Sequence, residues 1–140
     1  HAGESAGPES VWHAIQDLGA TRIGHAVRIL EDPDLVKFMR ERQIGIETSL
    51  TSNVPTNTVP SYAKHPLKTF LDYDLLATIN TDDPGISPVT IKDEFRLAVE
   101  KAGLTQEDTR KAQQNALAIA FLSQQEKQAL QLSKGEVTKK

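Results

Sequence analysis

The sequence predicts an α/β protein with a parallel sheet, and three features of the chain lead to this fold class. Short apolar segments suited to buried strands alternate with amphipathic segments suited to helices. The intervals between the strand segments leave room for the right-handed helical crossovers that connect parallel strands. Polar residues follow the predicted ends of the strands. A doubly wound sheet and part of a (β/α)8 barrel both fit this alternation.

Composition narrows the class of protein. With 140 residues, 38% of them hydrophobic and 25% charged, the chain is about one globular domain long. A net charge of -3 gives no basic surface for phosphate groups, so we expect no nucleic-acid partner. Apolar runs stay well short of the roughly 20 residues that cross a bilayer, so we expect no membrane partner and a cytoplasmic location. The lack of cysteine excludes disulfides, thiolate metal sites and cysteine nucleophiles.

The first predicted helix begins near Pro8, because proline at the first helical position loses no hydrogen bond that the helix needs. Val11, Ile15 and Leu18 form one apolar face of this helix, which ends at Gly19. We expect that face to pack against the rest of the domain.

Two strands and a connecting helix follow. Residues 22–27 and 44–48 are short and apolar enough to form buried strands. Between them, residues 32–34 (Asp-Pro-Asp) open a helix, because they combine a capping carboxylate with a proline at the helix start. The residues of that helix predicted to face inward are Leu35, Phe38 and Met39.

The middle of the chain predicts a loop and then a third helix and strand pair. Residues 49–61 are rich in Ser, Thr, Asn and Pro, which is typical of a loop. A short helix over residues 66–73 leads into a strand over residues 75–80. Two histidines receive no catalytic role: His13 lies on the predicted solvent side of its helix, and His65 precedes a proline in a loop.

Helices alone are predicted after the last strand. Their approximate ranges are residues 90–102, 105–121 and 123–132. Thr105 with Asp108, and Ser123 with Glu126, match the capping-box pattern, in which a hydroxyl and an acid three residues later satisfy each other's backbone N–H groups.

Residues with catalytic chemistry fall at the predicted carboxyl ends of the strands. These residues are His1, His25, Asp82 and Asp83. Active sites of barrels lie at that edge, where residues distant in sequence converge on one ligand. Imidazole and carboxylate groups suit zinc, but a catalytic zinc needs at least three protein ligands and an open position. His1 and Asp82 alone are therefore too few.

Each of these residues also has a purely structural interpretation. His1 can be an exposed terminal residue, and His25 can be a hydrogen-bonded histidine of the core. Asp82 and Asp83 precede Pro84-Gly85, and Asp, Pro and Gly all suit a turn. Glu4 can serve the helix that begins near Pro8. The joint placement of these residues, rather than any one of them, favours a functional site.

Four segments carry a resemblance to a known family. They are His1-Ala2-Gly3-Glu4, Arg22-Ile23-Gly24-His25, Ser49-Leu50-Thr51-Ser52-Asn53 and Asn80-Thr81-Asp82-Asp83-Pro84. In order and spacing the chain resembles bacterial adenosine deaminase, in the metal-dependent amidohydrolase superfamily. The resemblance implies that residues 1–140 are the C-terminal part of one deaminase barrel domain, about the last four strand positions of a TIM (β/α)8 barrel followed by additional helices.

The resemblance also implies a role for each site residue. His1 and Asp82 would ligate zinc, and Glu4 would be the general acid that protonates purine N1. His25 would orient the attacking water and either take up its proton or stabilise the charge that develops, and Asp83 would hydrogen-bond purine N7. The implied reaction is the hydrolytic deamination of adenosine and 2′-deoxyadenosine to inosine and 2′-deoxyinosine plus ammonia, a step of purine salvage.

One departure from the family limits this expectation. The family takes two more zinc ligands from a His-x-His pair on its first strand, and the chain contains no such pair. We therefore expect the N-terminal half of the barrel to be a necessary partner, to supply the two histidines for a single zinc, and the isolated chain to be inactive. An adenine deaminase-like relative and a non-catalytic fragment or binding domain are the alternatives.

Overall fold

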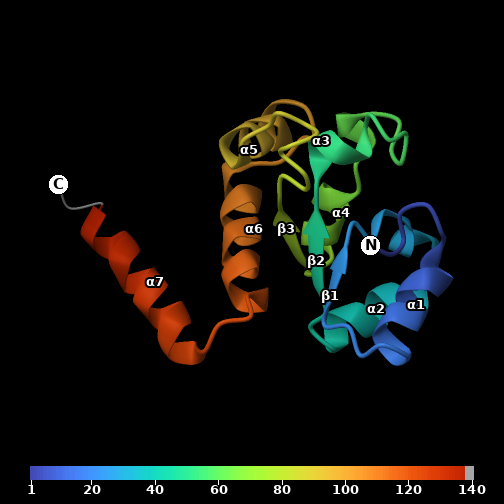
Figure 1. Ribbon diagram of the computed structural model, residues 1–140, viewed down its shortest axis with the longest axis horizontal. Helices are drawn as coiled ribbons and strands as arrows, with labels where there is room; N and C mark the ends of the chain where they lie inside the picture. The colour runs from blue at the N-terminus through green and yellow to red at the C-terminus, as the bar shows by residue number, and fades with distance from the viewer. Residues whose placement is uncertain (138–140) are drawn as a thin grey trace.

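A parallel sheet of three strands in the order β1-β2-β3 forms the centre of the structure, a computed structural model that describes residues 1–137 (Figure 1). The strands are β1 (Arg22–Gly24), β2 (Gly45–Thr48) and β3 (Leu76–Ile79). Ala2 adds an isolated parallel bridge to His25, on the β1 side of the sheet. The chain therefore contributes three strands and the trace of a fourth at one edge.

Helices connect and follow the strands, as the alternating pattern predicted. In chain order they are α1 (Pro8–Gln16), η1 (Val27–Glu31), α2 (Pro33–Glu41), α3 (Leu50–Asn53), η2 (Tyr62–Lys64), α4 (Leu67–Asp72), α5 (Ile91–Glu100), α6 (Gln106–Ile119) and α7 (Gln124–Val137). Within the described residues, no strand follows β3, as predicted.

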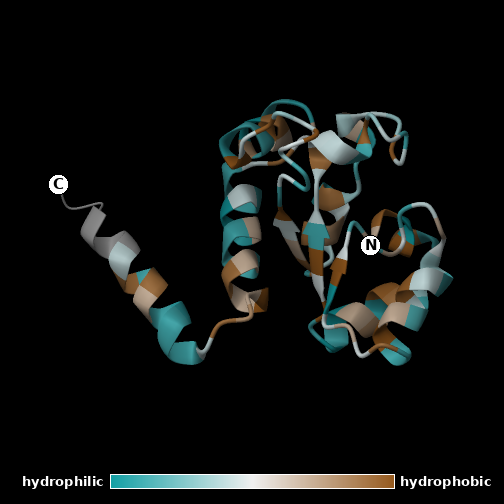
Figure 2. Cartoon of the chain, in the orientation of Figure 1, coloured by the Kyte–Doolittle hydropathy of each residue, from teal (hydrophilic) through white to brown (hydrophobic). Residues whose placement is uncertain are grey.

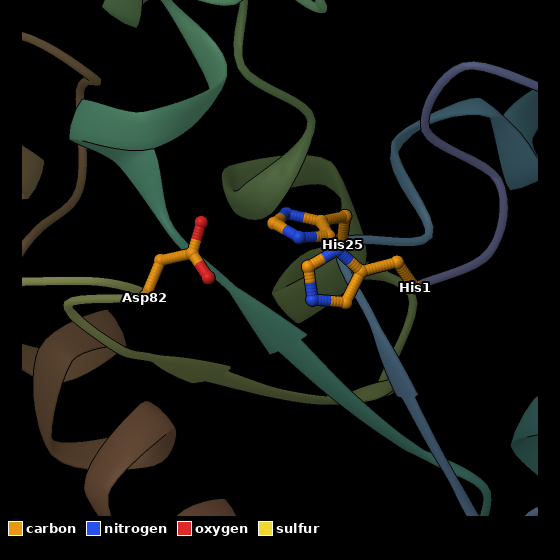
Figure 3. Close-up of side chains that lie close together, drawn as sticks. All are labelled: His1, His25 and Asp82. Carbon is orange, nitrogen blue, oxygen red and sulfur yellow. The ribbon is translucent and has the colours of Figure 1, made fainter. Parts of the chain in front are cut away.

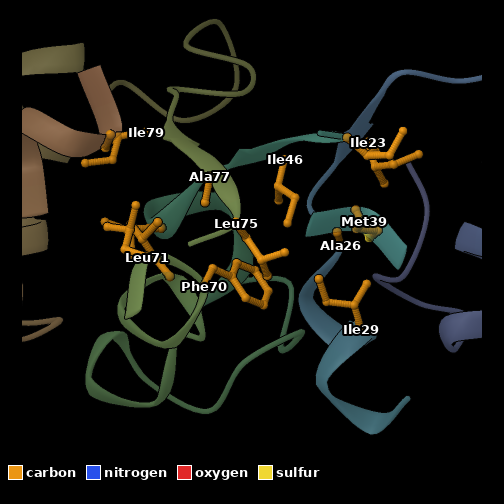
Figure 4. Packing of buried hydrophobic residues seen from close by; sticks show 14 of the residues in the cluster. Ile23, Ala26, Ile29, Met39, Ile46, Phe70, Leu71, Leu75, Ala77 and Ile79 are labelled. Atoms are coloured by element: carbon orange, nitrogen blue, oxygen red, sulfur yellow. The ribbon is translucent and has the colours of Figure 1, made fainter. Parts of the chain in front are cut away.

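One face of the sheet carries the hydrophobic core. Alternate strand residues such as Ile23, Ile46 and Ala77 are adjacent in register and at most 3% exposed, and side chains from the helices cover them (Figure 4). Among the covering residues, Phe70 of α4 and Met39 of α2 are fully buried. This continuous apolar layer is what holds the helices on the sheet.

The other face of the sheet is polar. Arg22 lies diagonally across from Glu47, with its Nε 3.4 Å from Oε1, and both side chains are partly exposed. Thr78 is the register partner of Glu47 and accepts a hydrogen bond from Asn80 Nδ2 at 2.8 Å. Near Gly45 this polar face is covered, because Ile119 of α6 fills the space beside the glycine. An apolar face covered by helices and a polar opposite face are expected of a segment of barrel wall.

Three predictions about the elements were wrong in detail. Helix α1 ends at Gln16, so Leu18 lies beyond it and is 82% exposed instead of belonging to an apolar helix face. The strand predicted over residues 22–27 ends at Gly24, because His25 and Ala26 have positive φ angles of 69° and 50°, which no strand accommodates.

The third difference concerns the predicted loop over residues 49–61, which contains the short helix α3. The carboxylate of Glu94, from α5, accepts hydrogen bonds from the backbone N–H groups of Leu50 and Thr51, both at 3.1 Å. These groups are the unpaired donors at the start of α3. A residue distant in sequence thus stabilises a helix that local composition does not favour.

Helix α7 differs from the other helices. It extends away from the sheet (Figure 1), and Figure 2 shows an apolar section midway along an otherwise polar helix. Leu130 and Leu132, in that section, are 50% and 74% exposed. None of the described helices combines the length and apolar character needed to cross a bilayer.

Candidate active site

The candidate site lies where the strands end. His1, His25 and Asp82 each offer one ligand atom, and these atoms all lie within 4.8 Å of one another. Figure 3 shows the two imidazole rings together, with Asp82 reaching toward them from the loop after β3. The rings meet edge to face, with 4.6 Å between their centroids. The structure thus brings together residues that are 81 positions apart in the numbering, as expected for one edge of a parallel sheet.

Backbone contacts fix His25 at this edge. Its N–H donates to the carbonyl of Glu47 on β2 at 2.9 Å, and the next N–H, from Ala26, donates to the carbonyl of Ala2 at 3.0 Å. Gly3 has a positive φ of 65°, and a Cβ there would lie 2.8 Å from Val11 Cγ2, so only glycine fits without rearrangement. The segment that carries His1 and Glu4 is therefore docked directly on the turn that carries His25.

The two aspartates after β3 have different surroundings. Asp82 has a positive φ of 61°, and its Oδ2 accepts a hydrogen bond from Ser52 Oγ at 2.6 Å. Asp83 is exposed, and its Oδ1 accepts from the N–H of Gly85 at 2.9 Å, which is the turn chemistry considered above. Because β3 ends at Ile79, strand alternation does not set the directions of these side chains.

Glu4 lies between the two histidines. Its Oε2 is 3.9 Å from His1 Nδ1 and 3.6 Å from His25 Nε2. Its Oε1 accepts hydrogen bonds from Asn53 Nδ2 at 3.2 Å and Thr58 Oγ1 at 3.4 Å. The Glu4 side chain is 17% exposed, so it is mostly buried but still accessible from the site.

Two buried residues that the sequence left without a role complete the site. Asn53 is fully buried, and its Nδ2 lies 3.1 Å from His25 Nδ1. His65 is 5% exposed rather than lying in an open loop, and its Nε2 lies 3.1 Å from Asn53 Oδ1. Asn53 belongs to one of the motifs quoted above, but no local signal identifies His65, because its contact depends on the path of the chain between residues 54 and 64.

Burial changes the protonation of His65. Removal from water, with a smaller effect of the neighbouring His25, lowers the pKa of His65 from 6.5 to about 4. His65 is therefore neutral at physiological pH. Burial also raises the pKa of Glu94, although the N–H groups of Leu50 and Thr51 oppose the shift.

Comparison with known proteins identifies the family. The family model described as adenosine deaminase matches residues 1–135. The chain belongs to the adenosine deaminase family. It is 58% identical over 130 residues to the adenosine deaminase of Klebsiella pneumoniae (strain 342), and that match covers 93% of this chain and 39% of the relative. The adenosine deaminase of Escherichia coli O1:K1 / APEC is 57% identical over the same shares.

Solved structures support the fold. An adenine deaminase from Arthrobacter aurescens superposes with a TM-score of 0.91 at 28% identity, over 100% of this chain and 43% of that chain. An amidohydrolase from Burkholderia ambifaria with bound Zn gives a TM-score of 0.85 at 26% identity, over 94% of this chain and 37% of that chain. The predicted family and the predicted α/β partial barrel are both confirmed, and the chain spans 39% of the length of the curated relatives it matches.

Proposed function

We propose that this chain is the C-terminal part of an adenosine deaminase barrel that converts adenosine and 2′-deoxyadenosine to inosine and 2′-deoxyinosine plus ammonia. The observation that carries the proposal is the convergence of His1, Glu4, His25 and Asp82 at one edge of the sheet, in a chain 58% identical to a curated adenosine deaminase. Three observations support a barrel completed by other strands: the unmatched length of the relatives, the partly exposed Arg22 and Glu47 on the polar face of the sheet, and the bridge at Ala2.

His1 and Asp82 would hold a single zinc ion, with two further histidines supplied by the rest of the barrel. One imidazole and one carboxylate are a donor set that zinc accepts, and the hydrogen bond from Ser52 holds the Asp82 carboxylate in place. The zinc bound to the Burkholderia ambifaria relative supports the choice of metal. When bound, zinc supplies a Lewis acid that makes water nucleophilic near neutral pH.

The other site residues would act on the purine and the water. Glu4 would give a proton to purine N1, which makes C6 more electrophilic, and its position between His1 and His25 suits that role. His25 would orient the attacking water and either take up its proton or stabilise the developing charge. Asp83 would hydrogen-bond purine N7 through Oδ2, since Oδ1 already accepts from Gly85, and N7 is an acceptor, so the carboxyl would have to be protonated.

A hybrid enzyme tests the proposal. It joins the part of Klebsiella pneumoniae adenosine deaminase that this chain does not match to residues 1–140, in the order that completes one barrel. We expect the hybrid to contain zinc and to deaminate adenosine, measured by ammonia release, and the isolated chain to show no turnover. Adenine is the comparison substrate, because the Arthrobacter aurescens structure is an adenine deaminase. A well-folded hybrid without activity on adenosine would contradict the proposal.

Replacing Glu4 tests its role within the hybrid enzyme. Glu4→Gln keeps the size of the side chain and an oxygen that can accept from Asn53 and Thr58 but cannot transfer a proton, so deamination should fall by a factor of about 10²–10⁴ while the zinc content stays the same. Glu31→Gln is the matched control, because Glu31 is an exposed acid that pairs with Arg28. Equal turnover of the Glu4→Gln and Glu31→Gln variants would show that Glu4 is not the proton donor.

A further inference from the structure

A directional series of hydrogen bonds runs from the backbone to the candidate site. It begins at the N–H of Leu67, which donates to His65 Nδ1 at 3.1 Å. A backbone N–H can only donate, so Nδ1 of His65 must accept. Since His65 is neutral, its ring hydrogen is on Nε2, and Nε2 donates to Asn53 Oδ1 at 3.1 Å.

This step determines how the Asn53 amide is oriented. With Oδ1 accepting from His65, the NH₂ group of Asn53 points the other way, toward the site. It donates to Glu4 Oε1 at 3.2 Å and to His25 Nδ1 at 3.1 Å. A flipped amide would place a donor against the donating Nε2 of His65, so the alternative orientation is excluded by the same contacts.

The consequence for His25 follows from its two ring nitrogens. Because Nδ1 faces a donor, it must keep its lone pair, and the hydrogen of the neutral ring is on Nε2. His25 is 3% exposed, and Nε2 is 3.6 Å from Glu4 Oε2, on the side that faces the site. The side chain therefore presents an N–H to the site.

We propose that Asn53, held by His65, is a positioning residue that fixes His25 as the Nε2–H tautomer, so that His25 acts as a hydrogen-bond donor and neither binds the metal nor accepts a proton. A metal-bound histidine donates its other ring N–H to a carboxylate or carbonyl, and His25 Nδ1 instead faces an amide donor. A protonated Nε2 also cannot take a proton from water. Although three side chains lie within metal-binding distance of one another, the hydrogen-bond directions leave His1 and Asp82 as the ligands.

The surroundings of Asn53 support a positioning role. Asn53 ends the short helix α3, and its neighbour Ser52 donates to Asp82 at 2.6 Å. The buried carboxylate of Glu94 holds the other end of α3 through two backbone N–H groups. One helical turn thus orients Glu4, His25 and Asp82 together.

The inference rests on the function proposed above. Two measurements on the hybrid enzyme distinguish a failure of the inference from a failure of the proposed function. Nuclear magnetic resonance of ¹⁵N-labelled histidine reports which ring nitrogen of His25 carries the hydrogen. We expect an unprotonated Nδ1 and a protonated Nε2, and the same pattern for His65. A protonated Nδ1 or a metal-bound Nε2 on His25 would overturn the inference whether or not adenosine is deaminated, and absent deamination with the expected tautomer would contradict only the proposed function.

Kinetics of two asparagine variants give the second measurement. Asn53→Asp offers only acceptor oxygens to His25 in its ionised form, so we expect the ring hydrogen to move to Nδ1 and kcat to fall about 10- to 100-fold, with a much smaller change in KM. Asn53→Ala removes the donor and should lower kcat without imposing the other tautomer. Asn115→Ala is the matched control, because Asn115 is also a buried asparagine, and it donates to the Ala77 carbonyl at 2.9 Å, away from the site. If kcat of the Asn53 variants fell only as much as that of Asn115→Ala, and the His25 tautomer did not change, Asn53 would have a structural role only. That result would overturn the proposal.

Discussion

The apolar face of the sheet, which the helices cover, and the edge where the strands end are stabilised in different ways. The apolar face depends on hydrophobic contacts, which have no direction and tolerate exchange between side chains of similar volume. The strand-end edge depends on hydrogen bonds whose donors and acceptors cannot be exchanged, from the Leu67 N–H through His65 and Asn53 to His25. The apolar face therefore sets the stability of the domain, and the strand-end edge sets the chemical state of the site.

The largest stability effect should come from the apolar region. Phe70 is fully buried in the core, so Phe70→Ala in the hybrid enzyme should lower the free energy of unfolding by about 3–5 kcal/mol. Leu18→Ala should change it by less than about 0.5 kcal/mol, since Leu18 is 82% exposed. Urea unfolding followed by circular dichroism measures both. Similar losses for the two variants would mean that the core is not packed as described.

The next effect is the pH dependence of stability that His65 causes at the strand-end edge. The pKa of His65 is about 4 in the folded protein and about 6.5 in the unfolded chain, so the unfolded chain binds more protons between these values. As the pH falls from 6.5 to 4, the free energy of unfolding should therefore decrease by about 3 kcal/mol because of His65. Below pH 4 this group should cause no further decrease.

His65→Gln isolates this effect, because glutamine does not titrate. Unfolding of both proteins measured across the same pH range should show a shallower decline for the variant. The same steep decline in the variant would assign the pH dependence to other groups, and His65 would not be a buried neutral histidine.

These two regions also differ in how far the sequence predicts them. Apolar spacing identified Val11, Leu35 and Met39 as core residues, because helix and strand periods mark the buried face directly. Strand ends likewise placed His1, His25 and Asp82 on one edge. Such patterns depend on a few neighbouring residues and one general rule about parallel sheets.

The contacts that orient the site were not predictable in the same way. His65 reaches Asn53 across a separation of 12 residues, and Asn53 reaches Glu4 across 49. Positive φ angles are uncommon at residues other than glycine, so nothing in the sequence predicted them at His25 and Asp82. Glu94 resembles a solvent-facing helix residue in the sequence, yet it is fully buried against α3.

A substitution of Glu94 should affect both the stability of the domain and the orientation of the site. Glu94→Ala leaves the N–H groups of Leu50 and Thr51 without their partner, which should cost about 1–3 kcal/mol of stability. It should also lower kcat, because α3 carries Asn53. Glu100→Ala on the same helix is the control, since Glu100 is exposed and pairs with Arg96. Stability loss with unchanged kcat would show that α3 does not orient the site.

The smallest effect is expected from removing the capping boxes of α6 and α7. Thr105 immediately precedes α6 and Ser123 immediately precedes α7, and each forms a capping box with an acid three residues later, Asp108 and Glu126 respectively. Helix α6 packs on the sheet, so Thr105→Ala should lower the free energy of unfolding by about 1 kcal/mol.

Helix α7 extends away from the sheet, so the loss of its cap should remain local. We expect Ser123→Ala to leave the unfolding midpoint unchanged and to speed hydrogen exchange in the first turn of α7 alone. Equal shifts of the midpoint in the two variants would show that α7 packs against the barrel in the hybrid enzyme.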